Sequence, residues 1–215
     1  MIRLAVSVEG QTEEEFVKSV LSPHLLAQKI YAVPILLGRA RVGRVGGGNV
    51  SQERLVSDMA HLYRSFDAVT SLVDFYGFKG KGNVSVEQLE KQLLDELQKR
   101  VGVNKSGVIP YVQRHEFEGL LFSNVSALLE IVDVPLEVAE KLSAIRERFQ
   151  SPEDINDNRA TAPSRRILDL VPNYRKRLHG PLIAEETGLE EIRAQCPRFN
   201  AWVRLLETLK QRIGE

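Results

Sequence analysis

The sequence predicts an α/β protein with a mostly parallel sheet of about four strands, helices on both faces of the sheet, and a helical C-terminal portion. Apolar, strand-like runs alternate with helical patterns as far as residue 113, the arrangement expected of a parallel sheet. Beyond His115 the helical pattern continues with no further convincing strand. We therefore expect an α/β domain over residues 1–123, with a helical portion over 124–215 packed on it.

The four expected strands are short apolar runs bounded by charged or turn-forming residues. They are placed at residues 2–8, 30–37, 68–74 and 107–113. Pro34, inside the second run, has no backbone N–H to give to a neighbouring strand. The second strand is therefore expected at an edge of the sheet or at an irregular position.

Helices are expected after the strands and throughout the C-terminal portion. Three pairs have the spacing of a capping box at a helix N-terminus: Thr12 with Glu15, Ser85 with Gln88, and Thr187 with Glu190. The helical segments of the C-terminal portion are expected near residues 116–130, 135–149, 163–178 and 188–212.

The composition is that of an ordinary globular protein. Hydrophobic residues make up 43% of the 215 residues, and 29 basic residues balance 29 acidic ones, so the overall charge does not indicate a polyanionic partner. The single cysteine, Cys196, excludes an intrachain disulfide and a cysteine-based metal site, and favours a reducing, cytoplasmic location. No apolar run is long enough to span a membrane.

Acidic residues follow three of the four expected strands. Glu9 ends the first, Asp74 the third, and Glu116 and Glu118 come just after the fourth. In an open parallel sheet, ligands bind at the carboxyl ends of the strands. Crowded carboxylates repel each other and are costly to bury, and a divalent cation offsets that cost. Oxygen ligands without cysteine, and with few histidines, favour Mg²⁺ or Mn²⁺.

Each of these acids also has a plain structural explanation. An acidic residue in a first helical turn commonly complements the helix dipole, and Asp74 is a suitable residue for a turn. Their joint occurrence at three strand ends favours a functional site. We predict that Glu9, Asp74 and Glu116 share one divalent ion. Glu13 and Glu118 are expected nearby, as a second ligand or as general acid/base.

Three segments carry a family resemblance. Residues 8–13, Val-Glu-Gly-Gln-Thr-Glu, resemble the first TOPRIM motif as it occurs in nucleases of the overcoming-lysogenization-defect class. With Asp-Phe-Tyr-Gly at 74–77 and His-Glu-Phe-Glu-Gly-Leu-Leu-Phe at 115–122, the chain resembles more closely the bacterial family called domain of unknown function 4276. Later segments are similar too, so the resemblance covers nearly the whole chain.

The resemblance implies a TOPRIM-like, Rossmann-type fold and metal-dependent phosphodiester chemistry. It makes Glu9 a metal ligand or general acid/base, and Asp74 the first aspartate of an Asp-x-Asp metal motif. Tyr76 stands where that motif has its second aspartate, and a tyrosine is a poor magnesium ligand at neutral pH. Either Glu116 and Glu118 supply the missing carboxylate, or metal binding is weakened or lost.

Basic residues cluster in three places. Arg39, Arg41 and Arg44 lie in a glycine-rich stretch, and Lys79 and Lys81 flank glycines just past Asp74. Such clusters suit contacts to the phosphates of DNA or RNA that do not read base sequence. A third cluster has six basic residues against one acid, and a solvated helix face is an alternative reading of its last three members. Its residues are Arg159, Arg165, Arg166, Arg175, Lys176 and Arg177.

Three functions remain open from the sequence. The first is a Mg²⁺- or Mn²⁺-dependent nuclease; the resemblance alone adds a bacterial defence role and an ATPase partner. The second is a non-catalytic, TOPRIM-derived interaction module that works with such a partner. The third is a phosphohydrolase for a small molecule. A basic groove would favour the first function, carboxylates paired with arginines the second, and a closed pocket the third.

Overall fold

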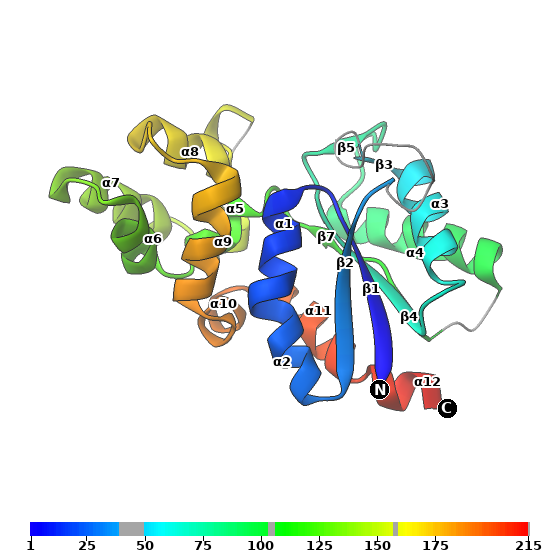
Figure 1. Cartoon of the computed structure of the whole chain (residues 1–215). Helices are drawn as coiled ribbons and strands as arrows, with labels where there is room; N and C mark the ends of the chain where they lie inside the picture. The colour runs from blue at the N-terminus through cyan, green and yellow to red at the C-terminus, as the bar shows by residue number, and fades with distance from the viewer. Residues whose placement is uncertain (39–49, 103–105, 157–158, 215) are drawn as a thin grey trace.

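The computed structural model describes residues 1–38, 50–102, 106–156 and 159–214. It confirms the predicted architecture, because a parallel sheet lies between two layers of helices and a further group of helices stands to one side (Figure 1). The strand order is β2–β1–β4–β6, and β7 also pairs with β4. The strands of this sheet are β1 (Ile2–Val8), β2 (Ile30–Leu36), β4 (Ala68–Asp74), β6 (Val108–Ile109) and β7 (Val112–Gln113).

Every strand pair in this sheet is parallel, and β2 lies at its edge. Just beyond β2, the N–H of Leu37 donates to the carbonyl oxygen of Val8 at 2.8 Å. Since backbone groups alternate in direction along a strand, the position of Pro34 is one whose N–H would point away from β1. The missing N–H of Pro34 therefore costs no hydrogen bond within the sheet, and the predicted edge position is confirmed.

The fourth expected strand is interrupted. β6 and β7 are separated by Pro110 and Tyr111. The hydroxyl of Ser71 on β4 accepts the N–H of Tyr111 at 3.0 Å and donates to its carbonyl oxygen at 2.9 Å. A side chain thus replaces the ladder bonds next to a proline that has no N–H, so the single strand predicted over 107–113 is wrong at these two residues.

Two helical layers cover the sheet. One face carries α1 (Gln11–Phe16), the π-helical turn η1 (Val17–Leu21) and α2 (Ser22–Ala27). The other face carries α3 (Gln52–Leu62) and α4 (Val86–Val101). Side chains of β1 alternate between them: Leu4 and Val6 pack toward α1, and Ala5 toward α3 and α4. A small second sheet pairs β3 (Val50–Ser51) with β5 (Phe78–Lys79).

Of the three expected capping boxes, the one at Thr187 and Glu190 is wrong, because α10 (Leu189–Gln195) has Gly188 as its N-cap. One of the other two is present. Ser85 and Gln88 form it at the N-terminus of α4. The prediction for Thr12 and Glu15 is wrong, because α1 begins at Gln11 with Gly10 as its N-cap and Thr12 is buried.

The helices after β7 are shorter and more numerous than predicted. Pro172 lies between α8 and α9, and Pro197 begins α11, where each interrupts the longer expected helix. The described α-helices of this part are α5 (Glu118–Leu121), α6 (Val125–Val132), α7 (Leu136–Glu147), α8 (Pro163–Leu170), α9 (Lys176–Thr187), α10 (Leu189–Gln195), α11 (Pro197–Glu207) and α12 (Leu209–Gly214). The 3₁₀ turns η2 (Pro152–Asp154) and η3 (Arg159–Thr161) lie between α7 and α8. No helix among the described residues is long and apolar enough to cross a membrane.

Helices α6, α7 and α8 stand beside the sheet, whereas α11 and α12 return to it (Figure 1). The indole N–H of Trp202 on α11 donates to the hydroxyl of Thr70 on β4 at 2.9 Å. The guanidinium of Arg198 donates to Glu90 on α4 at 2.7 Å and to the carbonyl oxygen of Val112 at 3.1 Å. One core therefore continues across residue 123, and the division into two parts at that residue stays a prediction.

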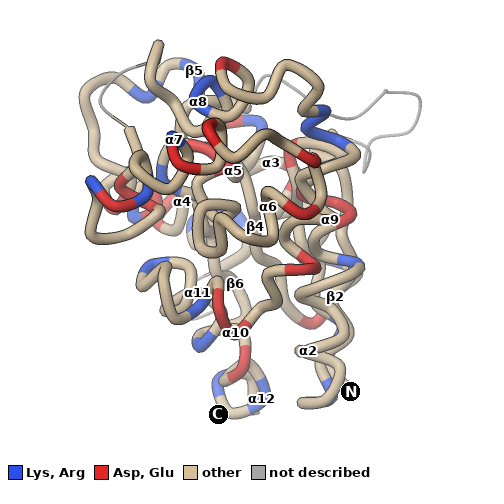
Figure 2. Tube along the Cα trace, turned by 90° about the vertical axis from the view of Figure 1, so that its left-hand side faces the viewer, with Lys and Arg blue, Asp and Glu red and all other residues tan. Residues whose placement is uncertain are grey.

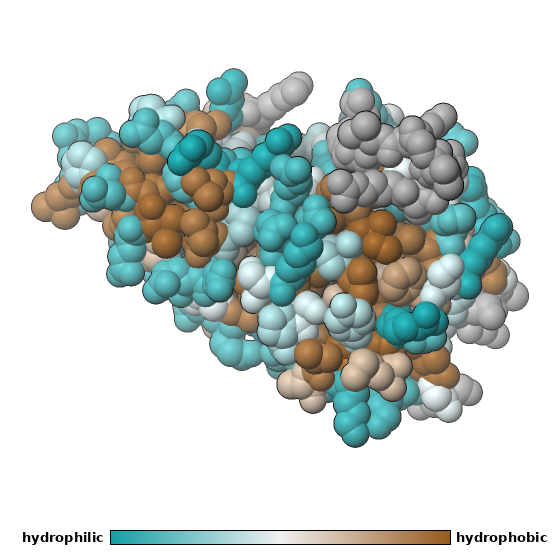
Figure 3. Space-filling view, in the orientation of Figure 1, coloured by the Kyte–Doolittle hydropathy of each residue, from teal (hydrophilic) through white to brown (hydrophobic). Residues whose placement is uncertain are grey.

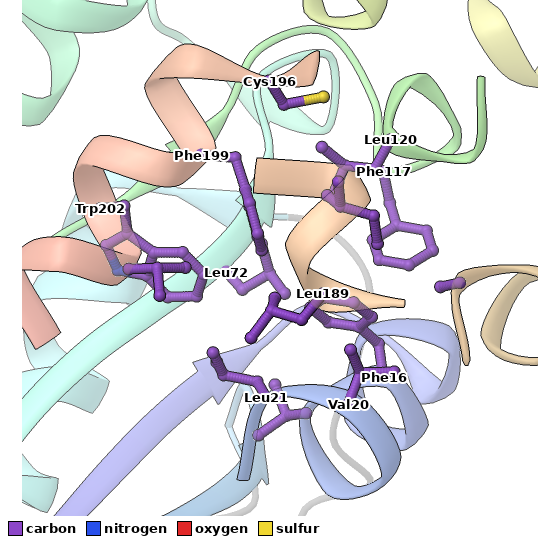
Figure 4. Close-up of a cluster of buried hydrophobic side chains, with 14 of the residues drawn as sticks. Phe16, Val20, Leu21, Leu72, Phe117, Leu120, Leu189, Cys196, Phe199 and Trp202 are labelled. Carbon is purple, nitrogen blue, oxygen red and sulfur yellow. The ribbon is translucent and has the colours of Figure 1, made fainter. Parts of the chain in front are cut away.

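The core on the α1 face is built around aromatic side chains (Figure 4). Phe16 meets Phe117 and Phe199 edge-on, with ring centroids 5.3 and 5.9 Å apart. Phe199 in turn packs edge-on against Trp202. These contacts join α1, the segment before α5, and α11. They also fix the backbone on which the acidic residues of the next section stand.

Hydrophobic side chains also reach the surface over α6 and α7 (Figure 3). Leu136 is 76% exposed, and Val132, Val134 and Val138 are only partly buried. Among the described residues of α7, only Leu142 is fully buried.

Replacing Phe16 by alanine tests whether this aromatic core holds the two parts of the chain together. Phe16 is fully buried, so we expect Phe16→Ala to lower the free energy of unfolding by about 3–5 kcal/mol. The control is Leu26→Ala on α2, where the side chain is 46% exposed and the expected loss is at most about 0.5 kcal/mol. Urea unfolding measures both. Equal losses in the two variants would contradict this view of the core.

The environment of Cys196 predicts a pH-dependent stability. Burial raises the pKa of its thiol from 9.0 to about 12. A raised folded-state pKa means that the stability it contributes is present below pH 9 and is lost as the pH rises toward 12. We expect wild-type stability to fall relative to Cys196→Ala by ~1.4 kcal/mol per pH unit in that range. The native thiol should also resist thiol reagents at pH 8, and rapid labelling there would contradict its burial.

Candidate active site at the carboxyl edge of the sheet

Four acidic residues stand close together where the parallel strands end. Glu9 follows β1, Asp74 ends β4, and Glu118 begins α5 shortly after β7. Glu13 comes from the first turn of α1, which leaves β1 at once. Parallel strands place their carboxyl ends at one edge of the sheet, which is the top edge in Figure 1. The topology thus gathers residues that are far apart in the sequence.

The ammonium group of Lys176, the first residue of α9, lies among three of these carboxylates. Its Nζ is 3.0 Å from Oε2 of Glu118, 3.6 Å from Oδ2 of Asp74 and 3.9 Å from Oε1 of Glu13. All three acidic residues are buried, whereas the lysine side chain is 41% exposed. We call Glu9, Glu13, Asp74 and Glu118 the carboxylate cluster.

Lys176 reaches the cluster because α9 packs closely on α1. A Cβ added to Gly180 of α9 would lie 2.9 Å from Cγ2 of Thr12 and 3.4 Å from the hydroxyl of Tyr174. Glycine therefore lets the two helices approach at this point. One helical turn before Gly180, this approach brings the start of α9 to Glu13.

Glu9 is accommodated by Gly77. A Cβ on Gly77 would lie 2.6 Å from Oε2 of Glu9, so a larger residue would displace the carboxylate. That oxygen is buried and has no hydrogen-bond partner among the described residues. Burial raises the pKa of Glu9, and the nearby charge of Glu13 raises it further. A hydrogen bond with the backbone of Asp74 opposes this shift.

The ionised forms of Asp74 and Glu118 are destabilised by burial. Oδ1 of Asp74 accepts the N–H of Phe117 at 2.8 Å. Burial raises the pKa of Asp74 well above its usual value, and burial likewise raises the pKa of Glu118, while Lys176 opposes both shifts. Burial would lower the pKa of Lys176, but Asp74 and Glu118 raise it well above its usual value. The lysine therefore remains charged.

A pocket of about 270 Å³ opens beside the cluster. It is lined by Glu9, Glu13, Asp74, Lys176 and Arg177, together with residues 10–12. The acidic donors are all oxygen atoms, which is the donor set that Mg²⁺ and Mn²⁺ prefer. As these side chains lie, however, no group of three or more His, Cys, Asp or Glu among the described residues is arranged to hold a metal ion. The ammonium of Lys176 lies among the carboxylates instead.

Glu116, predicted to share an ion with Glu9 and Asp74, is engaged elsewhere. Its Oε2 accepts the N–H of Ser164 at 3.0 Å, at the start of α8. Its part in a shared metal site stays a prediction.

Tyr76 turns to a separate group of polar side chains. Its hydroxyl accepts a hydrogen bond from the amide of Asn156, which also lies 3.3 Å from Nδ1 of His115. His115 has a φ of 63°, in the left-handed region, and its carbonyl oxygen accepts the N–H of Tyr76 at 3.0 Å. The residue in place of the second motif aspartate thus has partners outside the carboxylate cluster.

The predicted phosphate-binding residues have mixed placements. Lys79 on β5 is exposed, but the ammonium of Lys81 turns back to donate to the carbonyl oxygen of Phe75 at 2.9 Å. Arg39, Arg41 and Arg44 lie outside the described residues. Figure 2 shows basic and acidic residues interspersed along the described trace. The phosphate-binding role of these residues stays a prediction.

Sequence reasoning placed Lys176 in a basic cluster but not among the carboxylates. The spacing within residues 159–179 carries no signal for a lysine that pairs with Glu13, more than 160 positions away. Gly77 was available as a signal, because a glycine directly after the Asp-Phe-Tyr segment suggests close approach of another group.

Replacing Glu9 by glutamine tests whether the negative charge of its side chain lowers the free energy of unfolding. Its raised pKa means that its favourable contribution is present at low pH and lost as the pH rises through the folded-state value. At pH 7.5 with a chelator, Glu9→Gln should therefore equal or exceed wild type in free energy of unfolding. The control Glu14→Gln loses a partner of Lys18 and a favourable helix-dipole interaction worth about 0.3–1 kcal/mol. A loss above about 1 kcal/mol for Glu9→Gln would contradict this account.

Comparison with known proteins agrees with the fold. The chain has the fold of the C-terminal region of the Burkholderia pseudomallei OLD protein, with a TM-score of 0.54, 15% identity and 99% of each chain covered. The corresponding region of the Xanthomonas campestris pv. campestris OLD protein gives a TM-score of 0.48 at 15% identity, covering 98% of this chain and 96% of that one. No curated protein sequence matches the chain significantly. The family model described as domain of unknown function (DUF4276) matches residues 8–207, and the chain belongs to that family.

Proposed function

We propose that this protein is a divalent-metal-dependent phosphodiesterase that acts on nucleic acid. The observation that carries the proposal is the carboxylate cluster: Glu9, Glu13, Asp74 and Glu118 meet at the carboxyl edge of the sheet beside a pocket of about 270 Å³. Such an edge is where open parallel sheets bind their ligands. Four acids kept together at a cost to folding are more readily explained by chemistry than by stability.

The cluster fits Mg²⁺ or Mn²⁺ in its donor chemistry. Its donors are carboxylate oxygens, and two of them, Oε2 of Glu9 and Oε1 of Glu118, are buried without a hydrogen-bond partner among the described residues. These oxygens, with those of Glu13 and Asp74, would hold the cation. When bound, such a cation polarises a phosphoryl oxygen and lowers the pKa of a bound water.

The chain's own groups account for orientation and proton transfer. Glu9 has a raised pKa, so the oxygen of its carboxylate that does not hold the cation is suited to accept the proton of an attacking water. The water oxygen then bonds to phosphorus as the bond from phosphorus to the leaving oxygen breaks. The leaving oxygen takes a proton from solvent through the pocket. Phe117 and Gly77 keep Asp74 and Glu9 in place for this step.

A nucleic-acid substrate is supported by two exposed basic residues, one of them at the pocket. Arg177 lines the pocket and is exposed, and Lys79 is exposed on β5. Contacts of this kind bind phosphates whatever the base sequence, so DNA and RNA both remain substrates. The bacterial defence role, and the ATPase partner that the family resemblance implies, belong to this proposal as well.

Two observations favour a second function, a non-catalytic module that binds a partner protein. Lys176 already supplies a positive charge to the carboxylates, and Tyr76 replaces a motif aspartate and bonds to Asn156. Both features are compatible with a protein that has the same fold but binds no metal ion. A small-molecule phosphohydrolase is a third candidate function, and the cleavage assay described next distinguishes it from the other two.

Cleavage assays with and without metal distinguish these functions. Single- and double-stranded DNA, RNA and p-nitrophenyl phosphate are incubated with millimolar Mn²⁺ or Mg²⁺, or with a chelator. We expect polynucleotide cleavage only with metal, reduced about 100-fold or more by Glu9→Gln and unchanged by Glu14→Gln.

Other results would redirect the proposal. Full manganese-dependent cleavage by Glu9→Gln would remove Glu9 from the chemistry. Hydrolysis of p-nitrophenyl phosphate alone would favour the small-molecule enzyme, and the absence of any metal-dependent cleavage by wild type would favour the binding module.

A further inference from the structure

The carboxylate cluster carries more negative charge than its lysine offsets. The cluster has four carboxyl groups, and the single ammonium of Lys176 lies within 4 Å of three of them, those of Glu13, Asp74 and Glu118. Breaking a buried charge pair by removing one partner is strongly destabilising, and an unpaired buried carboxylate is costly. The contact with Lys176 therefore offsets part of the cost of burying these carboxylates, and the cluster still has more carboxyl groups than cations.

The fit of the lysine is also loose. Hydrogen bonds between charged groups usually measure about 2.7–2.9 Å. Only the 3.0 Å contact with Glu118 approaches that length, whereas Asp74 and Glu13 are 3.6 and 3.9 Å away. Glu118 is fully buried and its Oε2 contacts Lys176, but its Oε1 has no hydrogen-bond partner in the part of the chain that the structure describes. The cluster thus retains oxygen atoms that the ammonium does not satisfy.

The side chain of Lys176 is accessible from the pocket. Its side chain is 41% exposed and lines the pocket, and it begins α9, where the backbone is held by the rest of the helix. A divalent cation has twice the charge of an ammonium and binds several oxygens at once. It is the ligand class that the unsatisfied oxygens favour.

We propose that Lys176 is a tethered counter-ion that occupies the cation position of the metal-free protein, and that a divalent metal ion enters the carboxylate cluster by displacing its ammonium group. This inference rests on the metal site of the proposed function. It adds that metal binding competes with a residue of the chain itself. The ammonium of Lys176 stabilises the metal-free fold by offsetting the carboxylate charges. For the same reason, it lowers the affinity of the cluster for a metal ion.

Removing the lysine tests the competition directly. Calorimetric titration with Mn²⁺ compares wild type, Lys176→Met and the control Arg177→Met, whose exposed side chain lines the same pocket. We expect Lys176→Met to bind Mn²⁺ at least about tenfold more tightly than wild type, because a positive charge within 4 Å of shared ligands opposes the ion. Arg177→Met should change the affinity less than about threefold. Thermal melting should show Lys176→Met below wild type in chelator and regaining stability with Mn²⁺.

A second measurement uses the unaltered protein, in case Lys176→Met does not fold in chelator. Lysine acetylation followed by mass spectrometry should label Lys176 slowly without metal and several-fold faster with saturating Mn²⁺. Lys141, which is exposed on α7 and pairs with Glu137, is the internal control and should not change.

The outcomes separate this inference from the proposed function. Equal Mn²⁺ affinity in wild type and Lys176→Met, with unchanged labelling of Lys176, would overturn the competition while leaving a metal-dependent enzyme. Binding by Lys176→Met but not by wild type would support the competition and remove metal-dependent activity from the natural protein. Binding by neither would overturn both.

Discussion

The electrostatic balance between Lys176 and the buried carboxylates is the constraint on which the rest of this site depends. A parallel sheet brings the ends of β1, β4 and β7 to one edge, and this chain places an acid at or just after each. Left alone, such acids oppose folding. Lys176 offsets part of that cost, and it does so from a helix that must approach α1 closely enough for Gly180 to meet Thr12. The position of α9 is therefore an electrostatic requirement as well as a packing result.

The residues that form the hydrophobic core also position the carboxylate cluster. Phe16 lies three residues after Glu13 on α1, and its ring packs against Phe117, whose backbone N–H holds Asp74. Glu118 follows directly in the chain. Because these groups are fixed by a close-packed aromatic cluster, the carboxylates are held on rigid elements, as catalytic or metal-binding groups require. Energy from packing thus offsets the unfavourable grouping of charges.

The sequence predicted the sheet because its strands are continuous apolar runs with clear ends, and Pro34 marked the edge strand through its missing N–H. It did not predict the break at Pro110, since that depends on the hydroxyl of Ser71 replacing ladder bonds. Local pattern identified Glu9 and Asp74, and Glu13 and Glu118 were expected beside them. Lys176 was out of reach of such reasoning, because its position is set by the packing of helices that are distant in sequence.

Membership of the DUF4276 family and the fold of an OLD C-terminal region place this chain among proteins that share an architecture, and the carboxylate cluster is where its chemistry is proposed to lie. The most direct test is a crystal structure of the protein soaked with Mn²⁺, measured at the manganese absorption edge. The account predicts one or more anomalous peaks among Glu9, Glu13, Asp74 and Glu118, with the ammonium of Lys176 moved away from Glu118. Lys176 still in contact with Glu118, and no manganese among these carboxylates, would contradict it.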